Sequence, residues 1–434
     1  MNKKILDNFF KIIIFVPLIS FIFGFYFDED SAGGGGYKND SIWIRENINI
    51  FLTFSLKDAI LHPDLFGNRT PLIYILNKYL NPFFFDFEKY RTSVFFFSLI
   101  GPVFLYKILK VRFKEVDNKI LFFISSLVYL SPYYRTSAFW GLNENYGIIS
   151  SFISLYLIET FIRSDNRNIL KFILIIFFSS ITVYFDLKLL IIPLYCFYKI
   201  LRLNISNNFK IISLIFYFLL SLPYLYLIYI WQGLVPPLTQ LENPNTVTSF
   251  TDIKNIYFIH TGYAATIIAF YTFPLILFFK KDTLINFKDI IFSYKFALII
   301  FLSFLYVMIN FFILDFEKFT VTDYWIGLGV VHRLSLILTE SIRYQELLTY
   351  FFILLSLSFI SVFFILKKFD FYLISYFLII SLFLWPLMQE YFDPIILIIA
   401  FCLFNSIKTF NKLNSFFLFG YLSIFLIIAN LYYS

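Results

Sequence analysis

Charged residues are scarce in this sequence, since Asp, Glu, Lys and Arg make up only 15% of its 434 residues. Soluble domains are usually about a quarter charged. A surface with so few charges would not stay in solution, which excludes a cytosolic or secreted globular enzyme. Hydrophobic residues make up 60% of the chain and the mean hydropathy is +0.78. Most of the protein is therefore expected to lie in lipid.

Cysteine and histidine are also rare, with two and three copies. Neither a CxxC pair nor a cluster of Cys and His occurs, so a structural zinc site or a disulfide framework has no support. The P-loop, GxGxxG and HExxH patterns are missing as well. Without a nucleotide-binding motif, a soluble nucleotide sugar is not the expected substrate. The basic residues follow loop rims, so no nucleic-acid partner is expected.

Long apolar runs occupy most of the chain. One spanning helix takes about 20 apolar residues, and a window of about 19 residues predicts about 11–13 spans. They lie near residues 8–27, 92–111, 118–134, 146–163, 169–185, 187–201, 211–231, 257–279, 291–314, 348–366, 371–388, 391–407 and 414–432. The first run lacks a small-residue cleavage site and is expected to be retained. The predicted fold is all-α, a single polytopic membrane domain over residues 1–434 without a β-sheet domain.

The distribution of charge predicts the orientation. With a cytoplasmic N-terminus and alternating spans, 22 of the 35 basic residues and only 8 of the 28 acidic ones fall inside. Cytoplasmic loops carry such an excess of Lys and Arg. The expected location is a bacterial inner (plasma) membrane, with residues 28–91 and 315–347 as the two large outer loops. Asp186 and Lys188 are expected to pair in a short outer turn.

The first outer loop, residues 28–91, combines acidic residues with interfacial helices. It opens on Asp28-Glu29-Asp30, continues through a tetraglycine run at 33–36 and reaches Asp40. Asp40 or Ser41 can cap a helix, because a short side-chain oxygen accepts from free N–H groups there. The apolar side chains of that helix fall on one face: Ile44, Ile48, Phe51 and Leu52. This pattern predicts an amphipathic helix along the membrane surface, within a helical layer over residues 40–85.

Asp40 and Arg69 are the residues in this loop that best suit a transfer reaction. A carboxylate at the water–lipid boundary can act as general base. A guanidinium can hold a lipid phosphate through two hydrogen bonds. The structural alternative is that Asp40 only caps its helix and Arg69 only extends to the interface.

The order of these features resembles the GT-C superfamily of membrane glycosyltransferases, in particular its bacterial protein mannosyltransferase-like and aminoarabinose-transferase-like branch. In that family an Asp after the first span serves as base or as an anchor for the acceptor, and a basic residue before a Pro-Pro-Leu-like turn contacts the lipid phosphate. The resemblance gives these roles to Asp40 and to Arg69-Thr70-Pro71-Leu72. Thr70 replaces the first proline, and the tetraglycine run is an insertion. Because of that insertion, Asp28 and Asp30 are rivals of Asp40.

Two further segments add to the resemblance. Family members often carry an acidic residue at the outer turn that Glu144 occupies, which makes Glu144 a predicted substrate contact, although it could instead cap the next span. The segment from Trp385 to Pro394 is similar to a late R-Y-x-x-P segment. Glu390 stands there in place of the usual Arg, which leaves Gln389 and Tyr391 to bind a head group.

The loop 315–347 offers further candidates. Arg333 or Arg343 could supply the second phosphate contact, and the aromatic residues of this loop could bind sugar. The alternative is a solvated linker between spans. His62 lies close to the suspected site, and it is either a substrate contact or an interface residue.

The resemblance implies an inverting glycosyltransferase. Its donor would be a polyprenyl-phosphate sugar and its acceptor a glycan, lipid or protein at the outer face. No cofactor is required, although the clustered acids make a divalent metal possible. One alternative is an O-antigen-type polysaccharide polymerase or ligase, whose large outer loop usually comes late in the chain. The other is a lipid or solute transporter, which should bury charges mid-span. Only Glu159, near an inner end, is such a charge.

Overall fold

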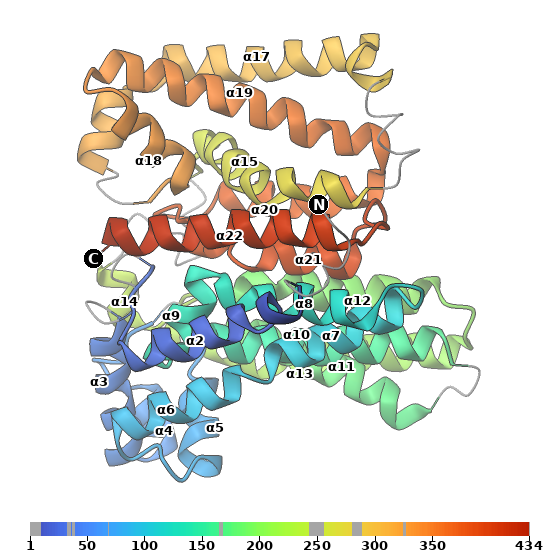
Figure 1. The fold of residues 1–434 in the computed structure, drawn as a ribbon. Helices are drawn as coiled ribbons and strands as arrows, with labels where there is room; N and C mark the ends of the chain where they lie inside the picture. Colours follow the sequence, from blue (N-terminus) through green and yellow to red (C-terminus); the bar gives the residue numbers. More distant parts are fainter. Residues whose placement is uncertain are drawn as a thin grey trace. The chain divides into compact units, whose positions relative to one another are not determined.

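The computed structural model describes residues 10–32, 36, 40–67, 69–164, 168–242, 256–279, 289–323 and 327–433 (Figure 1). Over these residues the chain is helical. It contains no β-strand there, only an isolated bridge between Phe279 and Ile407. The all-α class predicted from the apolar runs is therefore confirmed for the described part of the chain.

The described residues form two compact units. Residues 10–242 and 419–433 belong to the first unit, and residues 256–418 belong to the second. The prediction of a single membrane domain over the whole chain stays a prediction.

The first unit begins with one apolar helix and a set of short helices. These are α2 (Val16–Tyr26), α3 (Asp40–Thr53), α4 (Leu56–Ile60), α5 (Leu72–Leu80), α6 (Phe87–Ser98), α7 (Gly101–Arg112), α8 (Asn118–Ser126), η1 (Leu127–Leu130) and α9 (Pro132–Trp140). Longer helices follow, of which α10, α11 and α13 pack side by side (Figure 1). They are α10 (Glu144–Ile162), α11 (Ile169–Phe185), η2 (Leu187–Leu190), α12 (Ile191–Arg202), α13 (Asn207–Trp231) and α14 (Pro237–Glu242).

The second unit contains α15 (Phe258–Thr272), η4 (Phe273–Phe278), α17 (Tyr294–Ile313), η5 (Lys318–Asp323), α18 (Gly329–Leu338), α19 (Ile342–Leu366), α20 (Lys368–Ser381), η6 (Gln389–Tyr391) and α21 (Ile395–Leu403). Within it, α19 packs against both α15 and α17. The last helix, α22 (Lys412–Tyr433), belongs to the second unit up to Leu418 and to the first unit from Phe419 onward.

Seven of the described helices are long and apolar enough to cross a membrane. They are Phe87–Arg112, Glu144–Ile162, Asn207–Trp231, Phe258–Phe278, Tyr294–Ile313, Ile342–Phe363 and Lys412–Tyr432. Four apolar helices are shorter, with 10–17 residues: Phe10–Tyr26, Asn118–Leu130, Ile169–Phe185 and Gly329–Leu338. The helices thus follow the predicted apolar runs, and a count of spans above seven stays a prediction.

Short polar residues fix the ends of the helices near the first loop. The Asp86 side chain accepts from the N–H of Lys89 and starts α6, five residues before the predicted start at 92. The Ser131 hydroxyl accepts from the N–H of Tyr134 and starts α9. Gly141 ends α9 at a φ of 78°, where a side chain would be strained. These ends place the turn before α10 beside the helices of the first loop.

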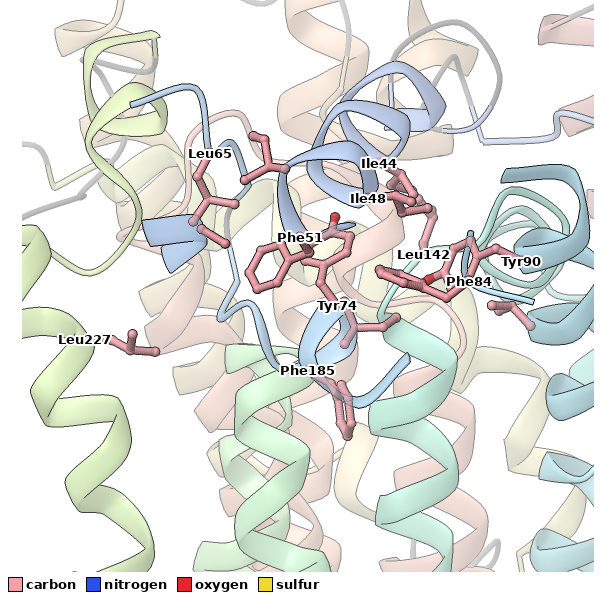
Figure 2. Packing of buried hydrophobic residues seen from close by; sticks show 14 of the residues in the cluster. Ile44, Ile48, Phe51, Leu65, Tyr74, Phe84, Tyr90, Leu142, Phe185 and Leu227 are labelled. Atoms are coloured by element: carbon pink, nitrogen blue, oxygen red, sulfur yellow. The ribbon is translucent and has the colours of Figure 1, made fainter. Parts of the chain in front are cut away.

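The predicted helical layer over residues 40–85 consists of α3, α4 and α5. Figure 2 shows the buried cluster beneath it, where the rings of Phe51 and Tyr74 stack with centroids 5.4 Å apart. Ile44 and Ile48 are buried in the same cluster, which confirms the predicted apolar face of α3. Leu52 is 41% exposed, so it lies at the edge of that face and outside the buried cluster. It follows Phe51 by one residue, about 100° around the helix, which takes it out of the contact.

The described part of the loop 315–347 is packed at several positions. Phe316, Phe319 and Leu328 are at most 5% exposed, and His332 in α18 is 2% exposed. These four residues do not fit a solvated linker, whereas Ile337 and Leu338 of the same stretch are exposed. The backbone N–H of Leu328 donates to the carbonyl of Leu387, with N and O 2.7 Å apart.

The orientation can be tested by cysteine labelling. Asn49 is exposed in the predicted outer loop, and Glu115 is exposed in a predicted inner loop. Both native cysteines, Cys196 and Cys402, are buried, so the background should be low. In whole cells a membrane-impermeant maleimide should modify Asn49→Cys and spare Glu115→Cys until the membrane is opened. The reverse pattern would overturn the predicted orientation.

Candidate functional site

A pocket of about 70 Å³ opens in the first unit between α3, the loop before α5 and the turn before α10. One ordered water needs roughly 10–15 Å³ of such a volume, so the pocket has room for several waters or for a small polar ligand in their place. It is lined by Asp40, Trp43, Ile44, Asn47, Leu65, Phe66, Gly67, Arg69, Thr70, Pro71, Tyr74, Leu142, Asn143 and Pro236. The two residues predicted from the sequence as base and phosphate ligand, Asp40 and Arg69, line this same pocket.

Asp40 is the first residue of α3 and is half-buried. The free N–H groups and the positive end of a helix dipole stabilise a negative charge at such a position. Asp40 is the first described residue of α3, and it is not surrounded by apolar side chains alone, since Arg69 and Asn47 line the pocket with it.

The loop that carries Arg69 is fixed by hydrogen bonds on both sides. Before it, the Asn47 amide donates to the carbonyl of Phe66 at 2.7 Å, and the N–H of Gly67 donates to the Thr239 hydroxyl at 2.9 Å. After it, the Thr70 hydroxyl donates to the carbonyl of Tyr184 at 2.7 Å. The backbone of Arg69 is therefore held in place relative to α3 and α11.

Arg69 forms an ion pair with Glu144, whose side chain is 1% exposed. The Arg69 guanidinium also donates to the Tyr133 hydroxyl at 3.1 Å, and that hydroxyl donates to Glu144. A third donor to the carboxylate is the Ser137 hydroxyl at 3.2 Å. Burial by itself would lower the pKa of Arg69, but the nearby acidic groups, Glu144 first, raise it well above its usual value. Arg69 is thus a permanent cation with a fixed orientation.

Two groups on the Arg69 guanidinium are left for a ligand. Both of its contacts with protein use Nη2, and within the described residues neither Nε nor Nη1 has a protein acceptor. The side chain is 23% exposed and lines the pocket. A guanidinium with free N–H groups beside a pocket can bind a phosphate oxygen.

The predicted pair of Asp186 and Lys188 is confirmed. The Nζ of Lys188 lies 3.0 Å from Oδ2 of Asp186. It also lies 4.7 Å from the centre of the Tyr133 ring, whose hydroxyl contacts Arg69. The pair therefore adjoins the Arg69–Glu144 network without lining the pocket.

The rival acids are placed elsewhere. Asp28, which is 63% exposed, forms an ion pair with Arg91. A Cβ added to Gly36 would lie 2.8 Å from Oδ1 of Asp30, so Asp30 packs against that glycine. Neither acid lines the pocket. The rest of the tetraglycine run, residues 33–35, lies outside the described residues.

His62 does not line the pocket either. Its Nδ1 accepts from the N–H of Asp64 at 3.2 Å, and its ring packs on Phe54 with centroids 4.7 Å apart. These contacts support the interface alternative for His62, and a substrate contact stays a prediction.

The other predicted ligands belong to the second unit. Arg333 lies in α18 and Arg343 near the start of α19, and Tyr391 ends η6. The Gln389 amide accepts from the N–H of Val330 at 2.7 Å and donates to the Tyr271 hydroxyl at 3.1 Å. Gln389 therefore joins α18 to α15. Whether any of these four residues contacts a head group stays a prediction.

His332 is buried without a hydrogen bond in the described part of the chain, at either ring nitrogen. Burial, together with the adjacent charge of Arg333, lowers its pKa from 6.5 to about 3. The folded protein thus keeps the ring neutral, while the unfolded chain binds a proton below pH 6.5. Acidification through this range must therefore favour unfolding.

Replacing His332 by Leu should remove this acid sensitivity. Between pH 6.5 and pH 5 the wild-type protein should lose about 2 kcal/mol of stability through this one group. Unfolding in mild detergent at pH 7.5 and pH 5 measures the difference, with His62→Leu, whose side chain is 19% exposed, as the control. Equal acid sensitivity in wild type and His332→Leu would contradict the prediction.

Metal ligands do not gather in the part of the chain that the structure describes. Within it, no three His, Cys, Asp or Glu side chains lie close enough to hold one ion. The possible divalent metal is therefore not assigned to any residues.

Several residues of the site were not found from the sequence. Tyr133 and Ser137 are four positions apart on α9, so both face Glu144. If this segment is taken as a helix, that spacing predicts that the two side chains lie on one face. Trp43 and Asn143 had no such signal, because only the fold brings them to one pocket.

The chain was compared with known protein families, with curated proteins and with solved structures. None of these three comparisons found a match.

Proposed function

We propose that this protein is a membrane glycosyltransferase. It transfers a sugar from a polyprenyl-phosphate donor to a glycan, lipid or protein acceptor at the outer face of the membrane. The observation that supports this proposal best is one pocket lined by both a carboxylate at a helix start, Asp40, and an incompletely paired guanidinium, Arg69.

The reaction needs one base and one cation. Asp40 accepts the proton of the acceptor hydroxyl or amine, and that oxygen or nitrogen forms a bond to the anomeric carbon. The bond between the anomeric carbon and the phosphate oxygen breaks, and polyprenyl phosphate leaves with the electron pair. A phosphate leaving group needs no protonation at neutral pH, so one carboxylate is enough and the anomeric centre is inverted.

Arg69 stabilises the leaving phosphate, and Glu144 acts as a positioning residue. Glu144 was predicted as a substrate contact, but its carboxylate is buried and used by Arg69, Tyr133 and Ser137. With Nη2 held by Glu144, Nε and Nη1 remain for the phosphate. Fixing the guanidinium before the substrate arrives lowers the entropy lost on binding.

The alternatives have weaker support. A transporter should bury unpaired charge along its spans, yet Glu159 lies 3.6 Å from Arg163 one turn later in α10. A polymerase or ligase would be expected to act through the late loop, whereas the pocket that combines a carboxylate with a guanidinium is lined by residues 40–236.

A transfer assay tests the proposal. The full chain in lipid nanodiscs is mixed with undecaprenyl phosphate carrying a labelled glucose, galactose, mannose or arabinose, and with a bacterial envelope extract as acceptor. At least one donor should release undecaprenyl phosphate and label an acceptor. Arg69→Lys keeps the charge opposite Glu144 but loses the planar fork, so transfer should fall about 10–100-fold. Arg45→Lys, at an exposed arginine of α3, should change transfer less than twofold.

Two outcomes would contradict the proposal. One is that no labelled donor is consumed while the same protein accumulates lipid or sugar across a sealed vesicle, which is transport. The other is equal activity of Arg69→Lys and Arg45→Lys, which would remove Arg69 from the phosphate site.

A further inference from the structure

Asn143 stands at the N-cap position of α10 without capping it. An Asn there normally accepts from the first free N–H groups of the helix. Here its backbone is already helical, with φ −73° and ψ −28°, and its side chain makes no capping bond. The residue is 8% exposed and lines the pocket.

The Asn143 carboxamide has no hydrogen-bond partner among the described protein atoms. The carboxamide is not fully enclosed by protein, and the pocket that Asn143 lines is the neighbouring space. An unpaired carboxamide at a pocket wall is available to bind a ligand there. A carboxamide offers two donors and one acceptor oxygen to a ligand.

Two other walls of the pocket suit the same ligand. The indole of Trp43 stacks on Phe66 with centroids 4.1 Å apart and the ring planes 27° apart, which fixes its orientation. The Tyr74 hydroxyl accepts from the Asn47 amide at 3.0 Å and keeps its own hydrogen to donate. Burial raises the pKa of Tyr74 to about 12, so this hydroxyl stays protonated at neutral pH.

A carboxamide, a neutral hydroxyl donor and a fixed aromatic face match one class of ligand. Sugar hydroxyls both donate and accept, and the C–H face of a sugar ring is apolar enough to lie against an indole. An anionic ligand is not favoured at Asn143, because the next residue is the buried carboxylate of Glu144.

We propose that Asn143, Tyr74 and Trp43 bind the sugar ring of the donor and select an uncharged hexose or pentose. This inference rests on the proposed function. Asn143 directly precedes Glu144, which holds Arg69, so the ring at Asn143 belongs to the sugar whose phosphate Arg69 binds. The hydroxyls bind the carboxamide and Tyr74, and the apolar face of the ring lies on Trp43.

Two lipid probes separate the sugar contact from the phosphate contact. Native mass spectrometry of the full chain in detergent measures the binding of undecaprenyl phosphate. It also measures the binding of the same lipid when it carries glucose, galactose, mannose, arabinose or glucuronic acid. The wild-type protein should bind the lipid with at least one neutral sugar more tightly than it binds the bare lipid phosphate. Glucuronic acid on the lipid should give no such increase in affinity.

Asn143→Ala should lower the affinity for the sugar-bearing lipid about tenfold. It should change the affinity for the bare lipid phosphate less than twofold. Asn49→Ala, at an exposed asparagine of α3, is the matched control and should change neither. Trp43→Ala should act like Asn143→Ala. Trp43→Phe keeps an aromatic face, so it should retain part of the extra affinity that the sugar gives over the bare lipid phosphate. Ile42→Ala, at the exposed neighbour of Trp43, should be neutral.

The outcomes distinguish a failure of this inference from a failure of the proposed function on which it rests. Equal losses for both lipids in Asn143→Ala and Trp43→Ala would show a structural role and overturn the sugar assignment alone. So would a wild-type protein that binds the bare lipid phosphate as tightly as every sugar-bearing one. If wild type binds none of these lipids, the proposed function itself fails.

Discussion

Asp40→Asn is expected to lower sugar transfer by about 10²–10⁴-fold, the range for loss of a general base. Asn keeps the size of the side chain and its ability to accept hydrogen bonds at the helix start, so the amount of folded protein should not change. At this position the end of α3 favours the ionised carboxylate, and Arg69 lines the same pocket. The transfer assay measures the rate, and the thermal midpoint in detergent verifies folding.

Asp30→Asn and Asp28→Asn are the controls for Asp40. Neither acid lines the pocket, and Asp28 already pairs with Arg91, so both variants should retain most of the transfer rate. Suppose instead that Asp30→Asn abolishes transfer while Asp40→Asn is tolerated. The alignment with the family pattern would then be shifted by ten residues, and the glycine-rich segment would be part of the active site.

The helices were predictable because their signals are local. Apolar runs of the right length gave the helix positions, and Asp40 gave the start of α3. Asp86 caps the start of α6, yet the hydropathy window placed that start five residues late. A window averages charge and apolar character, whereas a cap depends on one side chain.

The packing of distant segments was not predictable. The loop 315–347 contains charges and glycines, which favoured a solvated linker, yet Leu328 and His332 are buried. Composition gives the average polarity of a loop and does not show which of its faces is covered. The role of Glu144 was missed for a related reason, since Arg69 lies 75 positions before it in the chain.

The contact between Glu29 and Arg135 is the clearest case of distant segments whose packing the sequence did not predict. Its loss has the largest expected effect on stability. Arg135 is 1% exposed, and its Nε donates to Glu29 at 2.7 Å. Its other N–H groups donate to the carbonyls of Ser20 and Tyr129 at 2.9 and 3.0 Å. On α2, a Cβ added to Gly24 would collide with this guanidinium, so the glycine makes room for it.

Glu29→Met is expected to lower the free energy of unfolding by about 3–5 kcal/mol. Methionine matches the length of Glu29 but leaves the Arg135 charge buried without its counter-ion, and removal of one partner has about this cost. Denaturant titration in mild detergent micelles measures the loss. Asp28→Leu is the matched control at the neighbouring acid, because Asp28 is 63% exposed. Arg91 is itself 8% exposed, but it keeps Glu88 and the carbonyl of Phe139 as partners, so the loss should be much smaller than for Glu29→Met.

The double variant Glu29→Met with Arg135→Met shows whether the unpaired charge is the cause. With both charges gone there is no buried ion to solvate, and two apolar chains can occupy the space, so most of the stability should return. A double variant as unstable as Glu29→Met would mean that the hydrogen bonds of Arg135 to Ser20 and Tyr129 hold α2 against α9. Equal effects of Asp28→Leu and Glu29→Met would contradict the argument from burial, since only their exposure separates these two acids.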